Sequence, residues 1–303
     1  MIYALLLLLC SLHPAQASED IAILRSDDLA EYQVPIDAFV QDLTIPYRTY
    51  KLNGNADRAA RVGEKLAQDP PSLIFALGAK AAWTAHNSMP NTPLIYAMVH
   101  DPDRYGIDGI NVTGIRVEVP PQKVIAQFQL FAPDVKTIGI IISQNNSLSS
   151  VSEAISAAEE AGYEVIARRT ANPRDVRRVF IQLRSRIDAL WIIPDNEVVS
   201  PNNFHFIRSE ANRTRLPILA YSEALVHAGA LLCVAADLND IGHQAASLVP
   251  TILSGTNAGS IAPLEPEGTR VIFNKDTSQI IGLRFDDLLL DFVDEVIDEP
   301  TSR

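Results

Sequence analysis

The feature that most constrains this chain is a pair of apolar runs that each stop at a polar break. Residues 72–77 (SLIFAL) end at Gly78, and residues 94–99 (LIYAMV) end at His100. Between them, residues 81–85 (AAWTA) favour a helix. Continuous apolar strands that alternate with helices are typical of a parallel sheet covered on both faces. Because ligands of such sheets bind beyond the carboxyl ends of the strands, both breaks fall where a ligand would lie.

The same alternation runs through the rest of the chain and restarts at Pro120. Further strands are predicted at residues 20–24, 49–52, 137–142, 163–168, 188–193, 216–220, 231–235 and 269–274. Helical segments separate most of them, so the pattern predicts an α/β protein with doubly wound parallel sheets. The restart predicts two lobes that face each other. A helix at residues 239–253 follows after the second sheet is complete, and the acidic tail at residues 286–303 is expected to fray at its end.

The first residues are expected to be a cleaved signal peptide, residues 1–17, and the mature protein is expected in the periplasm. Residues 2–12 are almost wholly apolar, and Ala15-Gln16-Ala17 has the small residues of a cleavage site. Leu9 precedes Cys10 where a lipobox requires a small residue, so we favour cleavage over lipid anchoring. No Lys or Arg precedes Arg25, which leaves the true start codon open.

Composition and motifs argue against several classes of function. The net charge of −12 disfavours nucleic acid as a partner. Cys233 would be the one cysteine of the mature chain, so no intrachain disulfide forms, and its apolar neighbours predict a buried core residue. No G-x-S-x-G, Walker, G-x-G-x-x-G or H-E-x-x-H motif is present, and the six histidines are scattered. We therefore expect no catalytic residues, no metal site and no cofactor.

Polar residues follow the predicted strands of both halves. In the second half these are Asp195, Asn196, Ser222, Glu223 and Asp237, and in the first half Ser26, Asp27, Gly78, Ala79 and His100. Each one alone is more simply a helix cap or a turn former, and a loop histidine bonded to backbone is as good an interpretation of His100 as ligand contact. Together they describe two polar rims around a site for a small polar ligand.

The order of several short motifs resembles a known family. These motifs are Ala76-Leu-Gly-Ala-Lys-Ala-Ala82, Val99-His-Asp-Pro102, Asn111-Val-Thr-Gly114, Ile193-Pro-Asp-Asn196, Ala228-Gly-Ala230 and Gly242-His-Gln-Ala-Ala246. The series is similar to the ABC-transporter substrate-binding proteins that include tryptophan-binding and other amino-acid-binding members. The resemblance implies a type I periplasmic-binding-protein fold in which the helix at residues 239–253 returns to lobe 1. Lobe 1 would comprise residues 18–115 and 238–268, and lobe 2 residues 116–237 and 269–303.

The resemblance implies a non-catalytic protein that closes two lobes around a small polar ligand, an amino acid or similar, and delivers it to an ABC permease. A sensor that presents its ligand to a membrane kinase or cyclase is an alternative, and a periplasmic enzyme on the same scaffold is a further one. The candidate ligand contacts are Ser26, Gly78, Ala79, Lys80, Met98, His100, Asn145, Asp195, Asn196, Ser222, Glu223 and Asp237. The sequence differs from the family's usual Gly-Thr-Pro at Gly78-Ala79-Lys80 and from its Thr-Asp-Pro at His100-Asp101-Pro102.

An amino-acid ligand would place its charged groups on opposite lobes. Its carboxylate would meet N–H groups at residues 78–80, because a helix amino terminus presents unpaired donors. Its ammonium would need a carboxylate, either Asp237 or Asp195. The alternative for Asp237 is a helix cap, and Lys80 either adds a positive charge or points to solvent. The identity of the ligand, the oligomeric state and the choice between transport and sensing stay open.

Overall fold

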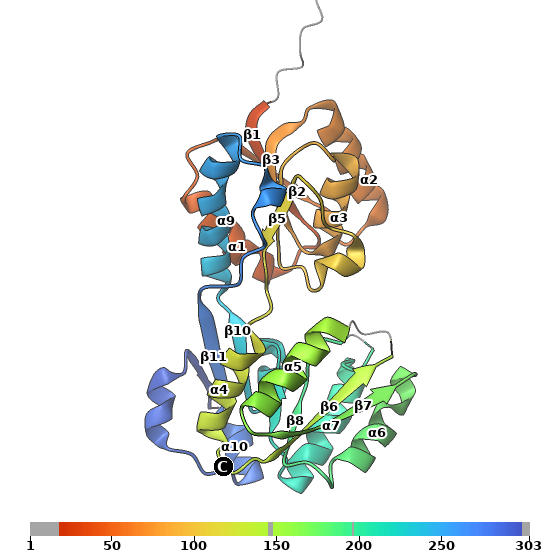
Figure 1. The fold of residues 1–303 in the computed structure, drawn as a ribbon, viewed down its shortest axis with the longest axis vertical. Helices are drawn as coiled ribbons and strands as arrows, with labels where there is room; N and C mark the ends of the chain where they lie inside the picture. Colours follow the sequence, from red (N-terminus) through yellow and green to blue (C-terminus); the bar gives the residue numbers. More distant parts are fainter. Residues whose placement is uncertain (1–17, 145–147, 196, 299–303) are drawn as a thin grey trace, which may run out of the picture.

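Two sheets, one after the other along the chain, organise the computed structural model, which describes residues 18–144, 148–195 and 197–298. Figure 1 shows them as two α/β lobes joined by a narrow connection. This arrangement confirms the expected fold of two doubly wound lobes. The predicted signal peptide, residues 1–17, lies outside the described residues. Within the described ranges, no helix combines the length and the apolar character needed to cross a membrane.

The first sheet is wholly parallel. Its strands are β1 (Ser18–Arg25), β2 (Tyr47–Lys51), β3 (Pro71–Leu77), β4 (Leu94–Ala97) and β5 (Val112–Ile115), in the order β2-β1-β3-β4-β5. One face carries α1 (Gln33–Gln41) and α9 (Leu238–Leu253), and the other carries α2 (Ala56–Gln68) and α3 (Ala79–Ser88). Ile21 and Ile23 pack towards α1 and α9, whereas Ala22 and Leu24 pack towards α2 and α3. This alternation explains the continuous apolar runs in β1, β3 and β4, whereas the edge strand β2 is polar and largely exposed.

In the second sheet the two strands at one edge, β11 and β12, run antiparallel to the other strands. Its strands are β6 (Thr137–Ser143), β7 (Glu164–Thr170), β8 (Ala189–Trp191), β9 (Ile218–Ala220), β10 (Leu232–Ala236), β11 (Thr269–Asn274) and β12 (Glu295–Ile297), in the order β12-β11-β10-β9-β8-β6-β7. Its helices are α4 (Pro121–Phe131), α5 (Leu148–Glu160), α6 (Val176–Leu183), α7 (Pro201–Thr214), α8 (Glu223–His227) and α10 (Lys275–Ile281). Strand β11 runs antiparallel to β10, because the chain enters it from the other lobe. Cys233 of β10 is fully buried, as predicted, and burial raises the pKa of its thiol to about 12.

The chain passes between the lobes beside the ends of β5, β10 and β11. Beyond β5, the Arg116 N–H donates to the Leu264 carbonyl at 2.8 Å, and beyond β10 the Asp237 N–H donates to the Gly268 carbonyl at 3.0 Å. The chain leaves the first sheet at the carboxyl end of β5 and the second sheet at the carboxyl end of β10. Since β4 is parallel to β5 and β9 is parallel to β10, the carboxyl edges of the two sheets face each other (Figure 1).

Helix α9 follows the second sheet in sequence but packs on the first lobe, beside α1. Gly242 permits this close approach, because a Cβ there would lie 2.4 Å from the Pro35 carbonyl oxygen. The late position of α9 in the chain is thus a consequence of the return crossing at Asp237.

Among the α-helices and β-strands of the described ranges, the sequence does not predict β5, α8 and β12. Each is between three and five residues long, too short to show a clear periodicity. The end of the acidic tail, which the sequence predicts to fray, lies outside the described residues, whereas an earlier part of the tail forms β12 and pairs with β11. Asp294 accepts the Val271 N–H at 2.7 Å, and the Lys275 ammonium lies 2.7 Å from Asp298.

Candidate functional site

The facing edges of the two sheets carry most of the predicted site residues. On the first lobe, the candidates lie after three strands: after β1, Ser26; after β3, Gly78, Ala79 and Lys80; and after β4, Met98 and His100. On the second lobe they also lie after three strands: after β8, Asp195; after β9, Ser222 and Glu223; and after β10, Asp237. The candidates Asn145 and Asn196 lie outside the described residues. The fold therefore places the described candidates at the ends of strands that point towards the opposite lobe.

Ser26 is built into the start of helix α3. Its buried Oγ accepts the Ala81 N–H at 2.8 Å, which satisfies one of the donors that a helix leaves open at its amino end. Gly78 precedes the helix with φ of +84°, and its N–H donates to the Ala97 carbonyl at 2.9 Å. The N–H groups of Ala79 and Lys80 are the remaining donors of the first turn, which follows directly after the end of β3.

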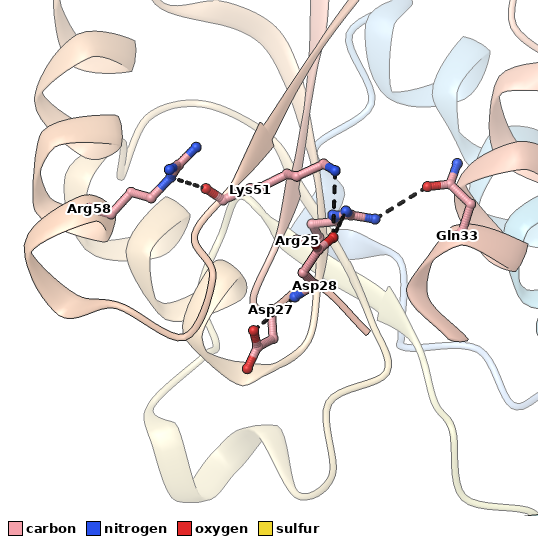
Figure 2. Close-up of polar contacts among 6 residues, drawn as sticks. All are labelled: Arg25, Asp27, Asp28, Gln33, Lys51 and Arg58. Carbon is pink, nitrogen blue, oxygen red and sulfur yellow. Dashed lines mark hydrogen bonds and ion pairs between the residues drawn. The ribbon is translucent and has the colours of Figure 1, made fainter. Parts of the chain in front are cut away.

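A polar cluster surrounds Arg25, the residue before Ser26, and Figure 2 shows its contacts. Arg25 is only 4% exposed at the end of β1. Its Nη1 donates to Gln33 Oε1 of α1 at 3.2 Å, and its Nη2 pairs with the Asp28 carboxylate. Lys51, the last residue of β2, approaches the same carboxylate at 3.5 Å. These contacts tie β1, β2 and α1 together at the edge of the first sheet.

The ammonium group of Lys80 is bound within the first lobe. Its Nζ donates to the carbonyl of Gly54, in the turn between β2 and α2. A charge held on that carbonyl stabilises the first lobe. The contribution of this position to a ligand would then come from its backbone N–H.

The loop after β4 is held in an unusual backbone conformation. Met98 has φ of +54° and Asp101 has φ of +52°, both in the left-handed region that residues with a Cβ seldom adopt. Such strain concentrates at sites where a defined geometry matters. His100 lies between these two residues and presents an exposed ring at the edge of the first sheet.

The ring of His100 contacts an aromatic ring of the second lobe. Its ring lies edge-on to that of Tyr221, the residue after β9, with centroids 6.4 Å apart and an interplanar angle of 84°. Strand β4 neighbours β5 and strand β9 neighbours β10, so the pair lies next to the connecting segments. Burial raises the pKa of the Tyr221 phenol, and the nearby charge of Asp195 adds to the increase.

Glu118 links His100 to the connection between the lobes. Its Oε1 lies 2.9 Å from His100 Nδ1. Burial alone would raise the pKa of the Glu118 carboxyl, but the hydrogen bond and charge of His100, with backbone N–H groups of Glu118 and Asp101, lower it below its ordinary value. The loop after β4 is therefore tied to the segment that follows β5.

Asp195 and Glu223 are engaged in contacts within the second lobe. Asp195 is buried; its Oδ2 accepts the Ser143 N–H at 2.7 Å, and its Oδ1 accepts the N–H groups of Glu197 and Val198 at 3.0 and 3.2 Å. Glu223 lies 3.1 Å from Nη1 of Arg270, a residue of β11. These contacts hold the loops after β8 and β9 in place.

Asp237 caps helix α9. Its Oδ1 accepts the Asn239 N–H at 2.8 Å, at the point where the chain returns to the first lobe. Ser222 precedes α8 and makes no side-chain cap bond to it. The capping role weighed for Asp237 in the sequence is thus present in the structure.

Sequence reasoning missed Tyr32, Glu118 and Tyr221. Tyr221 stands directly before Ser222 and could have been included from its position at a strand end. Tyr32 and Glu118 carry no local signal, because tertiary packing alone brings them to the edge of the first sheet. In the part of the chain that the structure describes, no group of three or more His, Cys, Asp and Glu side chains could hold a metal ion.

Comparisons with known proteins identify the family. Residues 40–297 match the model of the ABC transporter substrate binding protein family. A tyrosine-binding protein of Clostridioides difficile is 28% identical over 231 residues, a match that spans 74% of this chain and 66%, just under two thirds, of that protein.

Solved structures show the same fold. The ligand-free, open structure of a substrate-binding protein with adhesive properties from Clostridium difficile has a TM-score of 0.79 and 22% identity, covering 93% of this chain and 100% of the other. A domain from Streptococcus pneumonia in complex with L-Trp has a TM-score of 0.69 and 22% identity, covering 92% and 99%. A periplasmic ribose ABC transporter protein from Conexibacter woesei has a TM-score of 0.55 and 13% identity, covering 89% and 96%.

These findings agree with the two-lobed architecture and with the expectation of a binding protein rather than an enzyme. The family match covers well over half of the chain, including strands of both sheets. The chain belongs to the ABC transporter substrate-binding protein family.

Proposed function

We propose that this chain binds an aromatic amino acid between its lobes and delivers it to an ABC permease outside the cytoplasm. The observation that carries the proposal is the contact between His100 and Tyr221, which sets aromatic rings from both lobes at the facing edges of the sheets. Aromatic rings favour edge-to-face or offset packing with other rings. The tyrosine-binding relative and the L-Trp complex of a protein with the same fold support this class of ligand.

The ligand's carboxylate would bind at the amino end of α3. The Ala79 and Lys80 N–H groups are open there, and the positive end of the helix dipole favours an anion. Because Ser26 already satisfies Ala81, the carboxylate would sit on the outer donors of the turn.

The ligand's ammonium would meet Asp237 rather than Asp195. An ammonium enclosed without a carboxylate partner would be desolvated and unpaired, which is costly. Both oxygens of Asp195 already accept backbone N–H groups, whereas Asp237 uses Oδ1 for its cap. The side-chain ring of the ligand would then lie against Tyr221 and His100.

We also propose how the chain is divided between the two lobes. Lobe 1 would comprise residues 18–115 and 238–268, and lobe 2 residues 116–237 and 269–303. Residues 1–17 would be removed as a signal peptide on export, leaving the protein in the periplasm. The crossings beside β5, β10 and β11 would act as the hinge for closure.

The direct test is calorimetric titration of the mature protein, freed of bound ligand by mild denaturation and refolding, with a panel of amino acids and sugars. We expect L-tyrosine or L-tryptophan to bind more tightly than L-leucine, L-glutamate or ribose. Mass spectrometry of the solute released on denaturation should identify the same compound. Binding of ribose in preference to every amino acid would overturn the proposal.

A further inference from the structure

The hydroxyl of Tyr32 lies beside Gly78, the residue that directly precedes α3. Tyr32 ends the short 3-10 helix Ala30–Tyr32 that precedes α1. A Cβ built on Gly78 would lie 2.5 Å from Tyr32 Oη and 2.7 Å from Ser26 Oγ. Glycine is required at this position both by that lack of space and by its φ of +84°. Two hydroxyl groups thus flank the first turn of α3.

The hydrogen bonds of these two hydroxyl groups leave the Tyr32 O–H available as a donor. Ser26 Oγ accepts the Ala81 N–H, so the Ser26 hydroxyl hydrogen can be given to Tyr32 Oη. Among the described residues, no carbonyl or carboxylate oxygen accepts the hydroxyl hydrogen of Tyr32. Burial raises the pKa of the Tyr32 phenol, with additions from Glu31 and Asp27 that outweigh the opposite effect of Ser26, so the group keeps its proton at neutral pH.

We propose that Tyr32 is a specificity-determining residue whose hydroxyl donates a hydrogen bond to the carboxylate of the bound amino acid. The same carboxylate would accept the N–H groups of Ala79 and Lys80. Tyr32 would thereby select α-amino acids with a free carboxylate over the corresponding amides and amines. This inference rests on the proposed function and names a contact that neither the sequence pattern nor the family match assigns.

The test is calorimetric titration of wild type and Tyr32→Phe, each with L-tyrosine and with L-tyrosinamide. Tyr32→Phe removes only the hydroxyl and keeps the ring that packs on the core of the first lobe. Since hydrogen bonds to charged groups are the stronger ones, we expect L-tyrosine to bind about 10- to 100-fold more weakly to the variant. L-tyrosinamide should lose less affinity than L-tyrosine does, because its neutral carbonyl oxygen accepts a weaker hydrogen bond than a carboxylate oxygen.

Tyr47→Phe is the matched control, because Tyr47 is exposed at the opposite, amino edge of the same sheet. It should bind both compounds as the wild type does, and thermal melting should show all three proteins folded. Equal affinity of wild type and Tyr32→Phe for L-tyrosine overturns the inference alone. An equal loss of affinity for L-tyrosine and for L-tyrosinamide also overturns the inference, since Tyr32 would then act through packing. A wild type that binds no aromatic amino acid overturns the proposed function, and this inference with it.

Discussion

Asp195 and Asp237 show how the same residue type serves different purposes at equivalent strand ends. Asp195 holds three backbone N–H groups, two in its own loop and one at the end of β6, where Ser143 is 52 residues away in sequence. Asp237 holds one N–H, that of Asn239, at the start of its own helix. The first is therefore a structural anchor of the second lobe, and the second retains an oxygen that could meet a ligand cation.

Asp195→Asn should destabilise the protein. The amide has one acceptor oxygen, and its NH2 group would face backbone N–H donors that no longer have an acceptor. Leaving a buried donor unsatisfied costs about 1–3 kcal/mol, so the free energy of unfolding in urea should fall by about that amount. An unchanged unfolding midpoint would show that the Asp195 carboxylate is not needed to hold the loop.

Asp237→Asn should separate ligand binding from capping. Asn is as good an N-cap as Asp, so the melting temperature of the ligand-free variant should stay close to that of wild type. Loss of the ammonium's partner should weaken binding of L-tyrosine about tenfold or more in calorimetry. The matched control is Asp286→Asn, since Asp286 caps a short helix through the Leu288 N–H, in the C-terminal segment. Unchanged affinity in Asp237→Asn would remove this residue from the site.

At the scale of elements, the long apolar strands were the most predictable part of the fold. Runs such as residues 72–77 and 137–142 in the sequence correspond to β3 and β6 within one residue at each end. Burial on both faces leaves so strong a pattern that local sequence is sufficient. Strand β12 could not be predicted in this way, because its pairing depends on β11 and on ion pairs such as that between Glu295 and Arg270.

For the candidate site, the sequence predicts positions but not the contacts between side chains. The end of each strand can be located from the apolar pattern, which is why the sequence predicts Ser26 and His100 as candidates. Their partners were not predictable, because the Ser26 bond to Ala81 spans 55 residues and the His100 contact with Tyr221 joins different lobes. The sequence indicates where a site lies, and tertiary packing determines which side chains complete it.

The pair formed by His100 and Glu118 makes the stability of the folded protein depend on pH. The folded-state pKa of Glu118 is lowered, so the unfolded chain binds this proton more tightly than the folded protein. The resulting stability is fully present above the unfolded pKa, about 4.3. It is lost as the pH falls through the lowered folded pKa.

Glu118→Gln should therefore be less stable than wild type at pH 5, and the difference should shrink by pH 3, in urea unfolding at each pH. His100→Gln should reduce stability at pH 5 in the same way, because it removes the partner of the carboxylate. The double variant should lose little more than either single variant, since both changes break one interaction. Fully additive losses would contradict a direct coupling of the two side chains.

At the scale of the whole molecule, function depends on where the connecting segments leave the sheets. The chain leaves the first sheet after β5 and the second after β10, each time at a carboxyl end, so loops of both lobes face each other. The His100 and Tyr221 rings already touch beside these segments. Closure would then bring the parts of the lobes away from the hinge together over a ligand held at α3 and Asp237.

Small-angle X-ray scattering of the mature protein, with and without saturating L-tyrosine, tests this account most directly. The account predicts a smaller radius of gyration with L-tyrosine, because the ligand binds both lobes and favours the closed arrangement. Ribose at the same concentration should leave the radius unchanged. A protein that binds L-tyrosine in calorimetry and keeps the radius of gyration of the ligand-free form would contradict closure of the lobes around the ligand.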